Sequence, residues 1–299
     1  MATVQVLSGA LDDERRREHI YAGDILVFKG VPPLGEFCAW TDALIRAAFG
    51  HLDPVRAQFE LDREDYVARV AALQKQFRTH RDAKRLCSAA LRSVGVDVRR
   101  TCWDWLYLRV LPHGEGHASR RTGTLGVHRD TWSSNVYAQT NWWAPIYPIT
   151  AERTIVFYPG YWSRPLANTS SRWDLQAIRA QRTARSAPDG GTAVALVPEP
   201  SEPVDLTSEL RMVVEPGDLL CFSGAHVHAS VPNRSGVTRF SVEVRTVDSD
   251  DVRLGRGAPN VDGQAPHVAL EWFHHIEDDT PLPALLAGRD RQDQEDDRA

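Results

Sequence analysis

Two segments of the chain, about a hundred residues apart, carry side chains that can bind a metal ion. The first contains His128 and Asp130, and the second contains His226 and His228 after a short apolar run. Residues two apart on an extended strand point to the same side, so each pair can present its side chains on one face. Two imidazoles and one carboxylate on one side of a metal leave three positions open, which suits Fe(II) and oxygen chemistry.

The order and spacing of these residues resemble the Fe(II)/2-oxoglutarate-dependent dioxygenases. A His-x-Asp pair is followed by a distal histidine, and Arg239 lies eleven residues after His228. The resemblance covers about residues 100–247 and is strongest to the phytanoyl-CoA-hydroxylase-like branch. The flanks that carry this further likeness are Ser230, Pro232, Asn233 and the stretches 140–146 and 157–160.

The resemblance implies a site for Fe(II), for 2-oxoglutarate as co-substrate and for O2. His128, Asp130 and His228 would hold the metal, and Arg239 would bind the distal carboxylate of 2-oxoglutarate. A guanidinium suits that role because its planar fork binds a carboxylate through two hydrogen bonds and stays charged when buried. The implied reaction forms succinate and CO2.

The presence of Asp130 bears on the outcome of this reaction. Relatives that halogenate have a small residue in its place, so the resemblance favours hydroxylation, at an unactivated C–H bond of a small molecule. The substrate class stays open among specialised metabolites, amino acids and nucleosides. Desaturation, epimerisation and ring formation also stay open, because they depend on how the substrate sits.

Several positions have two readings. His226 is the alternative to His228 as distal ligand, although the spacing to Arg239 favours His228. Arg245 shares a strand face with Arg239 and is an alternative carboxylate-binding residue or a structural ion-pair partner. Asn141 either contacts 2-oxoglutarate or is a core residue whose side-chain amide makes its hydrogen bonds within the protein.

Four further residues are candidates for substrate contact. Tyr107 and Arg109 face one side of an early strand, Trp132 follows the His128/Asp130 pair, and Trp143 lies in the predicted strand at 136–147. The alternative for the two tryptophans is a place in the core, since large aromatic side chains dominate burial.

A cupin-type metal-binding isomerase or sensor is the alternative function. The segment 217–233 also resembles the second motif of cupins. Cupins, however, usually supply His-x-His and a glutamate from their first motif, whereas this chain has His128-x-Asp130.

The elements that position these residues change in character along the chain. Residues 1–100 read as helix-rich, with apolar residues three or four apart predicting helices over about 37–48, 66–77 and 86–94. We expect residues 1–20 to form a loose charged arm and residues 24–28 to form a short strand.

The part from 101 to 250 reads as mostly β, with helices flanking it. Short strands between Gly/Pro turns predict a sandwich or barrel, and the resemblance implies a double-stranded β-helix (jelly roll). We expect one oxygenase domain over 1–299, with a possible lid insertion at 160–210, including a basic helix at 172–186, and a charged tail at 276–299. Strands are predicted at about 103–110, 136–147, 153–158, 192–197, 211–215, 219–223 and 238–247.

Composition excludes several other classes. The hydrophobic fraction is 42%, which is typical of an ordinary globular chain. The net charge is −5, and nothing in this balance favours a nucleic-acid partner. We find no apolar run long enough for a membrane helix and no signal peptide, and we expect a cytoplasmic protein with four reduced cysteines.

Overall fold

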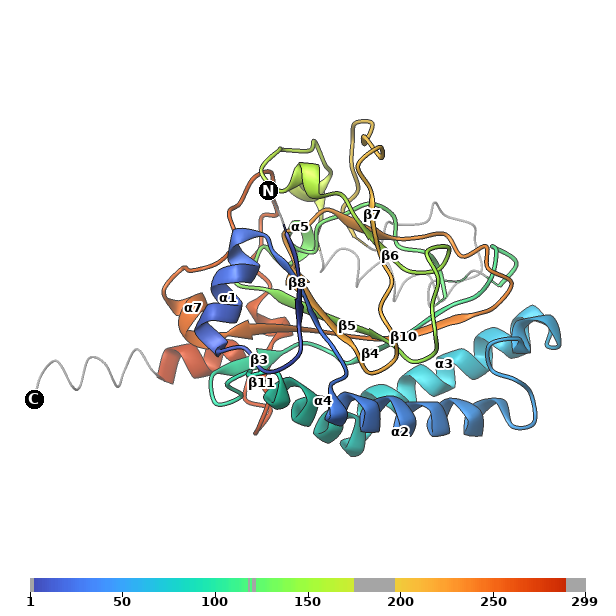
Figure 1. Cartoon of the computed structure of the whole chain (residues 1–299). Helices are drawn as coiled ribbons and strands as arrows, with labels where there is room; N and C mark the ends of the chain where they lie inside the picture. The colour runs from blue at the N-terminus through green and yellow to red at the C-terminus, as the bar shows by residue number, and fades with distance from the viewer. Residues whose placement is uncertain (1–2, 118, 120–121, 175–196, 289–299) are drawn as a thin grey trace, which may run out of the picture.

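Two β-sheets and a layer of helices build the fold (Figure 1). The computed structural model describes residues 3–117, 119, 122–174 and 197–288. The small sheet has the order β7 (Leu210–Met212), β6 (Ile155–Phe157) and β9 (His228–Ser230). Along the large sheet the order is β1 (Val4–Leu7), β2 (Ile25–Phe28), β8 (Leu219–Ser223), β5 (Thr140–Pro145), β10 (Arg239–Asp248), β3 (Thr101–Trp103) and β11 (His274–His275), and β4 (Tyr107–Leu111) also pairs with β10.

Strand pairing makes the large sheet mixed. β1 and β2 are parallel, while the other pairs of named strands are antiparallel. β10 is the longest strand and pairs with β3, β4 and β5. β10 therefore forms strand pairs along both of its edges and connects the two halves of the large sheet.

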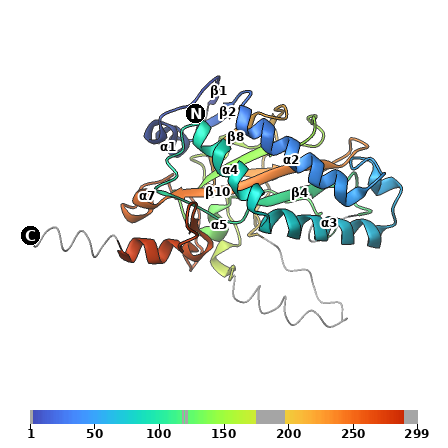
Figure 2. The same cartoon turned by 90° about the horizontal axis from the view of Figure 1, so that it is seen from below.

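Three helices cover the outer face of the large sheet, as Figure 2 shows from below. They are α2 (Pro32–Phe49), α3 (Arg63–Thr79) and α4 (Arg81–Ser93). Their apolar side chains form one buried cluster with residues of β4, β5, β8 and β10. The helices expected in the first hundred residues are present, and that part of the chain also supplies β1 and β2.

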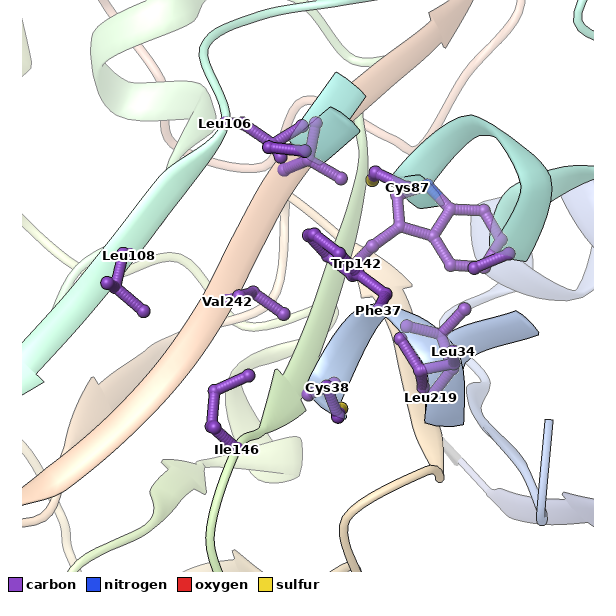
Figure 3. Packing of buried hydrophobic residues seen from close by; sticks show 14 of the residues in the cluster. Leu34, Phe37, Cys38, Cys87, Leu106, Leu108, Trp142, Ile146, Leu219 and Val242 are labelled. Carbon is purple, nitrogen blue, oxygen red and sulfur yellow. The ribbon is translucent and has the colours of Figure 1, made fainter. Parts of the chain in front are cut away.

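Alternation along β5 separates the two sides of the large sheet. Trp142 points to the helices and packs among side chains such as Phe37 and Val242 (Figure 3). Its neighbour Trp143 points the other way, into a second cluster with Phe157 and Phe222 between the sheets. Successive strand residues face opposite sides, so two adjacent tryptophans serve two different cores.

The N-terminal segment is ordered and is not a loose arm. α1 (Asp13–Ala22) begins after Asp12, whose carboxylate accepts hydrogen bonds from backbone N–H groups of the first turn. Arg17 is buried and binds Asp251, which lies in α7 (Ser249–Arg253). The expectation of a loose charged arm over 1–20 is wrong, because this segment forms β1 and α1 and its Arg17 pairs with acids from the distant C-terminal part of the chain.

The single strand expected at 103–110 is divided into β3 and β4. The break lies at Asp104, whose carboxylate accepts a hydrogen bond from the Arg245 backbone N–H (2.9 Å) and whose own N–H donates to the Arg245 carbonyl (3.0 Å). The predicted helix at 172–186 and strand at 192–197 lie largely outside the described residues, as do residues 175–196 of the 160–210 insertion and 289–299 of the charged tail. The described part of that tail is not a loose charged segment, because residues 282–288 are helical and Leu282 is fully buried.

Two expectations about the environment can be compared with the structure. All four cysteines are free and buried. In the described part of the chain, no helix combines the length and apolar character needed to cross a membrane.

The helical layer yields a stability prediction. Phe37 is 1% exposed and its ring lies 5.9 Å from that of Phe77. Phe37→Ala should lower the free energy of unfolding by about 3–5 kcal/mol, because it removes buried apolar area and leaves a cavity. Phe59→Ala, at a ring that is 56% exposed, is the control and should change stability far less. Equal effects of the two substitutions in chemical denaturation would contradict this packing.

Candidate metal centre

The two histidines predicted to bind metal are neighbours on paired backbone segments. His128 and His228 form an antiparallel bridge, with N–H···O distances of 3.0 and 2.9 Å in the two directions. Their ring centroids are 4.4 Å apart. The bridge joins the loop before α5 (Thr131–Ser134) to strand β9, so it brings together segments that are distant in the sequence.

Asp130 reaches the same place by a different route from the one expected. It does not continue an extended strand, because its backbone has helical dihedrals (φ −63°, ψ −33°) and it directly precedes α5. Its carboxylate nevertheless lies 3.9 Å from Nε2 of His128 and 3.7 Å from Nε2 of His228. One donor atom from each of the three buried residues lies within 4.8 Å of the others.

Hydrogen bonds orient both imidazoles. Nδ1 of His128 lies 2.7 Å from the Gly126 carbonyl, and Nδ1 of His228 lies 3.0 Å from the His226 carbonyl. A carbonyl only accepts, so each Nδ1 carries the proton and each Nε2 keeps its lone pair. Burial, with a contribution from His228, lowers the pKa of His128 to about 4, so this ring is neutral, as a metal ligand must be.

The Asp130 carboxylate is buried and ionised. Burial by itself raises its pKa, but Arg245, the two imidazoles and a hydrogen bond from Asn141 lower the pKa to about 2. Nδ2 of Asn141 donates to Oδ2, and Nη1 of Arg245 lies 3.6 Å from Oδ1. Each carboxylate oxygen therefore has its own partner, which holds the group in one orientation.

A second layer of residues holds these partners and was not predicted. Gln139 donates to Oδ1 of Asn141 (2.8 Å), and Asp104 lies 3.2 Å from Nε of Arg245. Burial, only partly offset by Arg245, raises the pKa of Asp104 to about 7. No local pattern marks Asp104 as a site residue, because its partner lies on β10 more than a hundred residues later.

A cavity lies beside the three candidate ligands and is lined by residues from both sheets. Asn141 and Trp143 come from β5, and Arg239 and Arg245 from β10. Apolar side chains complete much of the wall: Leu125, Ile155, Val197, Phe222 and Ala229.

Arg239 is the buried cation of this cavity. It is 2% exposed; Nη1 donates to the Thr154 carbonyl (3.0 Å), and Nη2 lies 3.5 Å from Oγ of Ser230. Its Nε has no partner, and no carboxylate of the described residues lies within ion-pair distance. Burial lowers its pKa to about 10, yet the group stays charged at neutral pH.

Arg245, the alternative carboxylate-binding residue, is already paired. Arg245 contacts Asp104 and Asp130, and these acids raise its pKa although burial acts in the opposite direction. This geometry favours Arg239 over Arg245 as the residue that receives an added carboxylate. Asn141 likewise contacts Asp130, where it can position the metal-binding carboxylate.

The four candidate substrate residues are placed unequally. Arg109 and Trp143 line the cavity. Tyr107 lies on the same face of β4, where the Arg245 guanidinium covers its ring at 5.6 Å. Trp132 is fully buried in a separate cluster and its indole N–H donates to Asp262 (2.6 Å), so its position does not favour substrate contact.

His226 lies away from the candidate ligands. It is buried, and its ring lies 4.5 Å from that of Trp162. Neither of its ring nitrogens belongs to the three-residue cluster. Among the two histidines of this segment, the geometry therefore favours His228.

These groups fit a ferrous ion and a keto-dicarboxylate. Two neutral imidazoles and one ionised carboxylate form the donor set suited to Fe(II) with open positions. The buried guanidinium with an unpartnered Nε supplies the group that a carboxylate needs.

Comparison with known proteins gives one family. Residues 21–241 match the model of the phytanoyl-CoA dioxygenase (PhyH) family. No curated protein sequence matches the chain significantly.

Three solved structures illustrate the structural likeness. EvdO2 from Micromonospora carbonacea var. aurantiaca is 14% identical, with a TM-score of 0.45 over 93% of this chain and 98% of its own. The non-heme monooxygenase ThoJ is 17% identical (TM-score 0.43; 75% and 74%). The epimerase SnoN, solved with Fe3+, alpha-ketoglutarate and nogalamycin RO, is 14% identical (TM-score 0.41; 79% and 85%). These values describe similarity only.

The geometry predicts which histidines matter for metal binding. His228→Ala should weaken Fe(II) binding by more than about a hundredfold, since even outer-shell changes cost 10–100-fold. His267→Ala is the control, at an exposed ring beside Glu271, and should leave the affinity unchanged. The measurement is anaerobic calorimetric titration with Fe(II), and wild-type affinity in the His228 variant would refute the assignment.

Proposed function

The chain belongs to the phytanoyl-CoA dioxygenase family of Fe(II)/2-oxoglutarate-dependent enzymes, and on that premise we propose that it hydroxylates an unactivated C–H bond of a small molecule. One observation carries the proposal. His128, Asp130 and His228 converge beside a buried Arg239 that lacks a carboxylate partner among the described residues. A metal-binding triad and a carboxylate-binding cation thus share one cavity.

The architecture supports this proposal. We infer that the two sheets are the two sides of a double-stranded β-helix, because the candidate ligands lie between them and His228 begins a strand of the small sheet. We also infer a single oxygenase domain. β2 from the N-terminal part pairs with β8 of the later part, so both parts share one sheet.

Each side chain has a defined task in this proposal. The Nε2 atoms of His128 and His228 and the Asp130 carboxylate hold the metal. Arg239 holds the distal carboxylate of 2-oxoglutarate, and its burial strengthens that contact because water competes less. Asn141 and Arg245 orient Asp130 rather than binding co-substrate directly.

The remaining cavity wall excludes water and receives the substrate. Trp143, Phe222 and Ile155 present apolar surface beside the ligands. When bound, Fe(II) and 2-oxoglutarate supply the oxidising chemistry, in which O2 gives one oxygen atom to succinate, formed with loss of CO2, and the other to the product. The protein contributes orientation and a water-poor environment.

Two alternatives are less consistent with the site. Halogenation is disfavoured because, as the family resemblance implies, halogenating relatives have a small residue in place of Asp130, whose carboxylate here is one of the three candidate ligands. A cupin-type isomerase or sensor leaves the buried Arg239 without a task, and the family match points to the dioxygenases.

The proposed function predicts turnover of the co-substrate. With Fe(II), 2-oxoglutarate and O2, the protein should form succinate, and more quickly when its substrate is present. Asp130→Ala should abolish succinate formation, because it removes one of three ligands. Succinate is quantified by chromatography, and its absence with the wild-type protein would refute the proposal.

The two buried arginines should respond differently. Arg239→Met should raise the KM for 2-oxoglutarate by about thirtyfold or more, as expected when one partner of a buried charge pair is lost. Arg245→Met should instead weaken Fe(II) binding by about 10–100-fold, because it acts on the orientation of Asp130. If only Arg245→Met raises the KM, the assignment of Arg239 is wrong.

A further inference from the structure

Three arginines and two carboxylates line the cavity, and a third carboxylate lies behind them against Arg245. β10 carries Arg239, Glu243 and Arg245 on one face, and β4 carries Arg109 on the same side. The remaining two carboxylates are the metal ligand Asp130 and its neighbour Asp104.

Glu243 and Arg109 form a two-point ion pair within this wall. Nε of Arg109 donates to Oε1 at 3.1 Å, and Nη2 donates to Oε2 at 2.8 Å. Both side chains are largely buried (19% and 25% exposed) and both line the cavity. Such a fork-to-carboxylate geometry uses both oxygens of Glu243, so the pair leaves Arg109 with little capacity for another anion.

The register places Arg109 close to the cation that should receive the co-substrate. Arg109 lies opposite Ser241, and Leu111 lies opposite Arg239. Arg109 and Arg239 are thus diagonal neighbours on adjacent strands, within reach of long side chains. A free guanidinium at Arg109 would compete with Arg239 for a carboxylate.

We propose that Glu243 is a specificity-determining residue, because its ion pair with Arg109 leaves Arg239 as the one cation of the described cavity wall that can take an added carboxylate. The cavity then binds a single 2-oxoglutarate, and the part of the substrate that enters beside it is uncharged. This inference rests on the proposed function, since it takes Arg239 as the co-substrate's partner.

Loss of either partner of the Arg109–Glu243 pair should disturb binding of 2-oxoglutarate. Without Glu243, Arg109 becomes a second site for carboxylates. Without Arg109, Glu243 is a buried carboxylate with Arg239 as its nearest free cation, and it competes with 2-oxoglutarate there. Without both, the wall again has one unpaired cation.

The test measures how many 2-oxoglutarate molecules bind and how tightly. The Fe(II)-loaded protein is titrated with 2-oxoglutarate by calorimetry in the absence of oxygen. The wild-type protein should bind one molecule per chain. Glu243→Gln should add a second, weaker binding event, and Arg109→Met should weaken the single event by about tenfold or more.

The double variant and a matched control separate this role from a structural one. Arg109→Met/Glu243→Gln should return to one event with an affinity within about threefold of wild type. Glu277→Gln makes the same change in the exposed pair with Arg92 and should leave the titration unchanged. A purely structural pair would make the double variant at least as impaired as either single variant.

Several outcomes overturn the inference. They are a second event in the wild-type protein, a single event in Glu243→Gln, or a double variant that stays impaired. If a variant fails to fold, the wild-type titration still tests the inference. It should show one 2-oxoglutarate site per chain, and added succinate should displace 2-oxoglutarate from that site. If Arg239→Met loses 2-oxoglutarate binding while the titration of Glu243→Gln is the same as that of the wild-type protein, this inference is refuted and the proposed function stands. A wild-type protein that binds no 2-oxoglutarate refutes the proposed function itself.

Discussion

The site depends on keeping the Asp130 carboxylate charged in a place that water barely reaches. Burial of an ionised group is costly unless partners replace its hydration. Here Arg245, Asn141 and two imidazoles supply those partners, and their combined effect outweighs burial and lowers the pKa of Asp130 to about 2. The carboxylate is thereby ready for a cation without first losing a proton.

The partners of the Asp130 carboxylate must themselves be held in place by other residues. Arg245 can orient Asp130 only while it is itself held in place, and Asp104, in the break between β3 and β4, holds it. Asn141 is oriented in turn by Gln139. The break between β3 and β4 and the buried amide of Asn141 are thus part of what positions the candidate metal-binding carboxylate.

Strand β10 connects these layers. On its inward face it carries Arg239, Glu243 and Arg245, while Phe240, Val242 and Val244 on its other face pack in the cluster beneath helices α2, α3 and α4. The inward side chains are therefore mounted on a strand that packing holds rigid. The same use of buried ion pairs recurs at Arg17, which ties the N-terminal helix to Asp251.

Local sequence determined a good deal of this protein. The periodicity of apolar residues located α2, α3, α4, β8 and β10, and the spacing of His128, Asp130, His228 and Arg239 pointed to a metal site with a carboxylate-binding cation. These features are readable because each depends on neighbours within a few residues, or on a pattern that a family shares.

Only the tertiary structure decided which charged groups pair. Arg109 binds Glu243 because β4 and β10 align in one register, and Arg245 meets Asp104 and Asp130 because three distant segments converge. Arg17 of the charged N-terminal segment proved to be buried for the same reason, because it pairs with the distant Asp251. Ion-pair partners are set by strand register and by the closure of long loops, and neither leaves a trace in the residues next to each charge.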